Sequence, residues 1–132
     1  MNAHIHQRAV TAYGQAAETI PPLRQIVMLY EGAILRLQEA KKAIAEERIE
    51  DRHRAVSKAA AIVDALQGCL DFEQGGEVAT HLDRFYTYVS FRIRQIDVRN
   101  DPAICDELIA RLGEMRESWA AIEGTTPRAA AG

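Results

Sequence analysis

The sequence predicts an all-α protein, an antiparallel up-down four-helix bundle preceded by a short helical segment. Apolar residues recur every three or four positions along most of the chain, and period-two alternation is almost absent. The chain holds only four prolines, so long stretches are left in which a helix is not interrupted. Its 132 residues are the length of one domain with one hydrophobic core.

The first two long helices are expected over about residues 20–46 and 50–71. Pro21 and Pro22 suit a first helical turn, and Thr19 is a candidate cap. In each helix one apolar seam follows the three-four spacing of a bundle. The first seam comprises Leu23, Ile26, Tyr30, Ala33, Leu37, Ala40 and Ile44, and the second comprises Val56, Ala59, Val63, Leu66 and Leu70.

The third and fourth helices are expected over about residues 77–99 and 102–123. A break at Gln74-Gly75-Gly76 precedes the third helix, and Asp101-Pro102 marks the start of the fourth, because Asp caps free amides and Pro fits the first helical position. The third seam comprises Ala79, Leu82, Tyr86, Val89, Ile93 and Ile96, and the fourth comprises Cys105, Leu108, Leu112, Met115, Trp119 and Ile122.

The chain therefore divides into three parts: an N-terminal segment with its linker (1–19), the bundle (20–123) and a flexible tail (124–132). Within the first part, the apolar residues Ile5, Ala9, Val10 and Tyr13 recur at helical spacing, and Ile5, Val10 and Tyr13 are the candidate packing residues. About ten residues are too few for a stable helix alone in water, so any order here must come from packing on the bundle. We expect this segment to act as a removable lid.

Composition excludes several classes of function. The net charge of −3 argues against nucleic acid as the main partner, because phosphate binding requires a basic excess. Arg92, Arg94 and Arg99 are interpreted as a solvated helix face. No signal peptide or membrane span is recognisable, and the two cysteines are interpreted as buried free thiols, which suits a reducing compartment. We expect a cytosolic (cytoplasmic) protein without membrane insertion.

Nothing in the pattern indicates catalysis, a metal or another cofactor. A di-iron bundle requires two Glu-x-x-His pairs, and the sequence has one, Glu50 with His53, in a charged helix start. His4 and His6 lie near the terminus without the further ligands that a metal site needs. We expect a protein that is not an enzyme.

Helices one and three carry more apolar side chains than one seam requires. A groove for an amphipathic partner helix would explain them, and deeper burial of these two helices would explain them equally well. In the first interpretation, the candidate partner-binding residues are Tyr13, Val27, Met28, Leu29, Ile34, Phe85, Tyr88 and Phe91. Gly32, in the middle of the first helix, has the same two explanations: a partner backbone could approach it closely, or another helix of the bundle could cross there.

Several segments, in order, resemble the flagellar secretion chaperones. The run from Met28 to Ile34 is similar to the family's Met-Leu-Tyr-x-Gly-x-Ile signature, and Leu82 to Tyr88 is similar to its Leu-x-x-Leu-Tyr-x-Tyr block. Asn100-Asp101 and the final helix with Arg116 and Trp119 also match, as does Tyr13 before the first helix. Phe85 stands where the family usually has an aliphatic residue.

The resemblance implies a four-helix bundle that binds the C-terminal segment of newly made flagellin in the cytosol. It implies that the chain prevents premature polymerisation and keeps the subunit competent for flagellar type III export, with components of the export apparatus as further partners. Two other functions stay open at this point: a regulatory or sequestering bundle for a different protein client, and a structural helical dimer.

Overall fold

A computed structural model gives the structure of the chain and describes residues 12–13 and 23–125. The described residues form four long helices and contain no strand. In chain order the helices are α2 (Leu23–Ala45), α3 (Ile49–Gly68), α4 (Phe72–Arg99) and α5 (Pro102–Thr125). The all-α prediction is confirmed.

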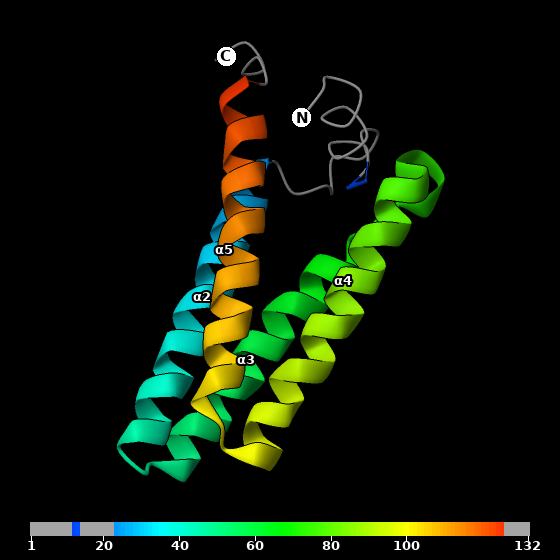
Figure 1. Ribbon diagram of the computed structural model, residues 1–132. Coiled ribbons are helices and arrows are strands. Elements are labelled where there is room, and N and C mark those ends of the chain that lie inside the picture. Colours follow the sequence, from blue (N-terminus) through cyan, green and yellow to red (C-terminus); the bar gives the residue numbers. More distant parts are fainter. Residues whose placement is uncertain (1–11, 14–22, 126–132) are drawn as a thin grey trace.

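Successive helices run in opposite directions and pack as a bundle (Figure 1). Helix α2 packs against α3 and α5, and α4 packs against the same two helices, so α2 and α4 lie diagonally across the bundle. Near the turn that connects them, α4 and α5 lie side by side, and they diverge toward their other ends (Figure 1). Away from that turn, Tyr13 contacts both helices, through Tyr86 of α4 and Trp119 of α5.

Left-handed residues end two of the helices, and side-chain caps begin the helices that follow two of the connections. Glu47 and Asn100 adopt the left-handed conformation, with φ of 58° and 51°, which ends α2 and α4. Asp71 caps α4 by accepting a hydrogen bond from the Gln74 amide at 3.0 Å. Asp101 accepts one from the Ala103 amide at 2.9 Å, as expected for the start of the last helix.

Some predicted boundaries were wrong. Helix α3 ends at Gly68 and not near residue 71, and α5 extends to Thr125. The break expected at 74–76 is a kink inside α4, which begins at Phe72, because the Asp71 cap starts a first turn before the chain bends. Gly76 makes the bend with φ of 51° and ψ of −128°, a conformation that favours glycine.

The core follows the predicted seams. Tyr86 and Trp119, both expected to be core, are buried. Leu23, Ile44, Leu70 and Met115 lie at the margins of the core and are only partly buried. Gly32 faces Ile62 of α3, whose Cδ1 would lie 3.4 Å from an added Cβ, an ordinary contact distance, so packing against α3 does not by itself require a glycine here. Among the described helices, none is long and apolar enough to span a membrane.

One ion pair and two hydrogen bonds near the α4–α5 turn join α3 to α4. Arg52 donates to Asp97 at 3.0 Å and to Asn100 at 2.7 Å, and His53 contacts the other Asp97 oxygen at 2.8 Å. The two pairs on Asp97 link the start of α3 to the end of α4. The ends of the helices at this side of the bundle are therefore held by direct contacts between helices.

Candidate protein-binding site

Helix α2 presents an exposed apolar stripe. Met28 and Leu35 are 54% and 49% exposed, and their spacing of seven residues puts them on one face of the helix. Leu29 and Ile34 flank the stripe and are partly buried against the core. This face of α2 is available to a partner, whereas Val27 is buried within the bundle.

Helix α4 carries a second exposed group, made of Tyr88, Phe91 and Val98, which are 40%, 58% and 84% exposed. Phe85, which lies close to them in the sequence, is partly buried. Because α2 and α4 lie diagonally, the two groups are not one continuous groove. A partner that contacts both must cross α3 or α5.

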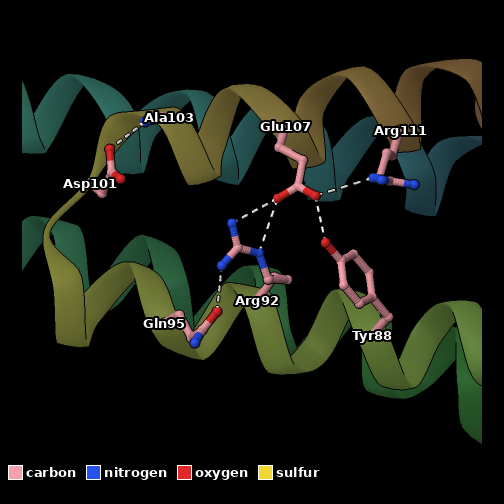
Figure 2. A network of polar contacts seen from close by, with 7 residues as sticks. All are labelled: Tyr88, Arg92, Gln95, Asp101, Ala103, Glu107 and Arg111. Atoms are coloured by element: carbon pink, nitrogen blue, oxygen red, sulfur yellow. Dashed lines mark hydrogen bonds and ion pairs between the residues drawn. The ribbon is translucent and has the colours of Figure 1, made fainter.

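Tyr88 also belongs to a polar network, the Glu107 network, that ties α4 to α5 near their turn (Figure 2). The Tyr88 hydroxyl donates to Glu107 at 2.5 Å, Arg92 contacts the same carboxylate at 2.9 Å, and Arg111 does so at 3.3 Å. The Arg111 guanidinium also lies over the Tyr88 ring, 5.4 Å from its centroid. The hydrogen bond from Tyr88 and the two arginines lower the pKa of Glu107.

Tyr13 enters the bundle between α4 and α5, at the far end from the turn. Its hydroxyl is hydrogen-bonded to that of Tyr86, which in turn lies 2.6 Å from the hydroxyl of Tyr30 on α2. We call these three residues the tyrosine cluster. The Tyr13 ring packs edge-on against Trp119 of α5, with centroids 5.5 Å apart. Tyr13 thereby contacts α4 and α5 directly, and it is linked to α2 through Tyr86.

Burial keeps these phenols neutral. It raises the pKa of Tyr30 to about 12, and the hydrogen bond with Tyr86 offsets part of that rise. Burial likewise raises the pKa of Tyr13 and Tyr86 far above the ordinary value. The Trp119 Nε1 is a buried donor that has no hydrogen-bond partner among the residues that the structure describes.

Two features of the α3–α4 connection hold the residue before Tyr13. The Asp71 amide donates to the Ala12 carbonyl at 2.8 Å. Gly75 is buried, and a Cβ there would lie 2.5 Å from the Ala12 Cα, so only glycine leaves room for the segment. The sequence reading treated Gly75 as part of a helix break and missed this role, because spacing alone does not reveal a close approach between distant segments.

The predicted site residues thus separate into three groups. Met28, Tyr88 and Phe91 are exposed, and Leu29, Ile34 and Phe85 are partly buried. Tyr13 and Val27 are buried. Of the predicted lid residues, Ile5 and Val10 lie outside the described part of the chain.

The described residues hold no group of three or more potential metal ligands. His53, half of the Glu-x-x-His pair, faces Asp97. Among the three arginines expected on a solvated face, Arg92 pairs with Glu107. The prediction of two buried thiols was wrong for Cys69, which is exposed, while Cys105 is buried and its pKa is raised to about 11, mainly by that burial.

Comparison with known proteins shows to which family the chain belongs. Residues 6–126 match the family described as Flagellar protein FliS. The chain belongs to the FliS family. It is 37% identical over 98 residues to the flagellar secretion chaperone FliSB of Pseudomonas aeruginosa, covering 74% of this chain and 78% of that protein.

Two other relatives are similar over more of the chain. The flagellar secretion chaperone FliS of Salmonella typhimurium is 34% identical over 116 residues, which are 83% of this chain and 86% of that protein. The FliS of Campylobacter jejuni is 36% identical over 112 residues, which are 84% and 88% of the two chains. The resemblance found in the sequence motifs is confirmed, and this family is one of flagellar export chaperones.

Proposed function

We propose that this chain is a cytosolic export chaperone that binds the C-terminal segment of flagellin. By covering that segment it prevents premature polymerisation and keeps the subunit competent for type III export. In this role the chain needs no cofactor and performs no catalysis. The observation that carries the proposal is the pair of exposed apolar groups on a complete helical bundle, Met28 with Leu35 and Tyr88 with Phe91 and Val98.

The arrangement of these groups favours an elongated client. They lie on diagonal helices, so a client that buries both must wrap around the bundle. A segment that is disordered before binding can cover such separated surfaces while it folds into helices.

The segment that contains Tyr13 serves in this proposal as a lid that the client displaces. Tyr13 is attached to the bundle by its own side chain and by the Ala12–Asp71 hydrogen bond. Displacement would free the faces of Tyr86 and Trp119 for a client side chain. The lid lowers apparent client affinity by the fraction of time for which it is closed.

Titration of the full-length chain with two forms of flagellin tests the function. We expect a complex with intact flagellin and none with flagellin that lacks its C-terminal segment, measured by size-exclusion chromatography with light scattering. An equimolar amount of the chain should also suppress flagellin polymerisation, followed by turbidity. Equal binding of both forms would contradict the proposal, and a free chain that elutes only as a dimer with its apolar groups protected would favour the structural alternative.

A further inference from the structure

A hollow with cationic walls lies between α2 and α3, beside the turn that joins them. Its volume is about 420 Å³, and two buried alanines, one from each helix, are part of its lining. Five cationic and two acidic side chains line the rest of it. We call this the cationic hollow; its cationic residues are Arg36, Lys42, Arg48, Arg54 and Lys58.

The two acidic side chains of the hollow are already paired with arginines. Arg36 donates to both carboxylate oxygens of Glu39, at 2.9 and 3.0 Å. Asp51 accepts a hydrogen bond from Arg54 at 2.8 Å and lies 3.1 Å from a guanidinium nitrogen of Arg48. With five cationic groups against two acidic ones, the hollow carries a net charge of +3 on a chain whose net charge is −3.

Lys42 and Lys58 provide the cations that are left for a ligand. They stand on opposite walls, Lys42 on α2 and Lys58 on α3, and both are exposed. Within the part of the chain that the structure describes, neither lysine has an acidic partner. Lys41, next in the sequence to Lys42, instead pairs with Asp106 of α5 at 2.8 Å and is not part of the hollow.

The cationic groups are spread along the hollow and not gathered at one point. Arg48 and Lys58 are ten residues apart at the start of and along α3, which is about 15 Å at the helical rise. Arg36 and Lys42 are six residues apart on α2, which is about 9 Å. A single phosphate or carboxylate group cannot contact both ends, so the hollow fits an extended anion with several charges.

The charge of the rest of the molecule selects among extended anions. Outside the hollow the chain has a net charge of −6, since the whole chain carries −3 and the hollow +3. Nucleic acid or an anionic membrane would reach over this acidic surface and be repelled by it. A short acidic stretch of a protein covers the hollow alone, and at physiological ionic strength its charges act over only about 8 Å.

The hollow also continues the exposed apolar stripe of α2. Lys42 is seven residues beyond Leu35, as Leu35 is seven residues beyond Met28, and this spacing puts all three on one face of the helix. A segment that lies along this face meets apolar side chains in the first half of α2 and cationic side chains near the α2–α3 turn.

We propose that the cationic hollow binds acidic residues of the client, beside the part of the client whose apolar side chains cover Met28 and Leu35. The inference rests on the proposed function, because it takes the C-terminal segment of flagellin as the occupant. The hollow sets the direction of the client along α2, with its acidic residues next to the α2–α3 turn. In the reverse direction the apolar residues of the client would lie against exposed lysines, and its acidic residues would lose their cationic partners.

Lys42→Glu and Lys41→Glu form a matched pair, because they are neighbours, make the same change of charge, and differ in that only Lys42 lines the hollow. The C-terminal segment of flagellin should bind full-length Lys42→Glu about five- to tenfold more weakly than the unmodified chain, since an attraction becomes a repulsion. It should bind Lys41→Glu within twofold of the unmodified chain. Fluorescence anisotropy of the labelled segment at low ionic strength measures both, and the difference should shrink as salt is added.

Equal affinities of the two variants in a formed complex would overturn the inference and leave the proposed function standing, whereas no complex with the unmodified chain would overturn both. Lys58→Glu tests the opposite wall of the hollow and should weaken binding about as much as Lys42→Glu. Normal binding by Lys58→Glu would overturn the hollow as the site. Both lysines are exposed, and thermal unfolding of each variant shows that the compared proteins are folded.

An exchange of charges identifies the client residue that faces the hollow. Each Asp and Glu of the flagellin segment is replaced by Lys in turn, and at least one replacement should weaken binding to the unmodified chain and restore about fivefold with Lys42→Glu. Failure of every replacement to restore affinity would overturn the inference. A single-stranded oligonucleotide and anionic lipid vesicles are the competing probes: binding of either that depends on Lys42, with flagellin binding independent of it, would also overturn the inference.

Discussion

Helices α4 and α5 are held together in two different ways along their length. Near their turn the Glu107 network joins them directly, with Tyr88 and Arg92 of α4 on one carboxylate of α5 (Figure 2). At the far end Tyr13, which belongs to neither helix, stands between Tyr86 and Trp119. The first region is closed by the bundle itself, and the second is filled by a separate segment, which we propose that the client displaces.

The largest loss of stability should come from a substitution at Trp119, in the part of α5 that lies far from the α4–α5 turn. Replacing Trp119 by Ala removes a buried ring that packs against Tyr13, and should lower the free energy of unfolding by about 3–5 kcal/mol in a denaturant titration. Phe91→Ala, which removes an exposed ring from α4, is the control and should cost less than about 0.5 kcal/mol. A Trp119→Ala variant with unchanged stability and lost client binding would show that this residue is a contact and not core.

Alkaline pH should weaken the same region. The phenol of Tyr30 has its folded pKa raised to about 12 from 10.0, so its contribution to stability is complete below pH 10 and is lost as the pH rises toward 12. The loss from Tyr30 alone should reach about 2 kcal/mol by pH 12. Tyrosinate absorbance at 295 nm checks this: Tyr13, Tyr30 and Tyr86 should ionise only together with unfolding, and ionisation before unfolding would contradict their burial.

Changes near the α4–α5 turn should lower the stability less, and the contribution of this region should be lost only when the pH is lowered. The Tyr88 hydrogen bond and the arginines hold the pKa of Glu107 low, so the stability it contributes is present above the ordinary Glu pKa and is lost as the pH falls below it. Glu107→Gln should cost less than about 1 kcal/mol at pH 7, since the site is partly exposed. The difference from the unmodified chain should shrink as the pH is lowered below the ordinary pKa of Glu, and a constant difference would mean that packing is responsible.

Substitutions at exposed positions of α2 should weaken client binding while they change the free energy of unfolding least. Met28→Asp should change the free energy of unfolding by less than about 0.5 kcal/mol, because the side chain is 54% exposed. It should weaken flagellin binding about tenfold if Met28 lies under the client. Gln38→Asp, also exposed on α2, is the charge-matched control. Collapse of stability with normal binding by the folded fraction would assign Met28 to the core.

The sequence was sufficient for features that depend on spacing. The seams around Tyr30, Tyr86 and Trp119 follow from the three-four repeat, and Asp101-Pro102 marked a helix start because its chemistry is local. It was not sufficient for contacts between distant segments. Nothing in the repeat indicates that Gly75 makes room for Ala12, or that the surplus residues of α2 and α4 would lie on diagonal helices.

Hydrogen exchange tests most directly whether the client displaces the segment that contains Tyr13. The full-length chain is compared with and without the C-terminal segment of flagellin, and deuterium uptake is followed in the peptide that ends at Tyr13. Our account predicts that uptake in this peptide rises when the client binds, while uptake around Glu107 is unchanged. Unchanged or lower uptake at Tyr13 in a formed complex would contradict the account, because the segment would then be a fixed part of the bundle or of the binding site.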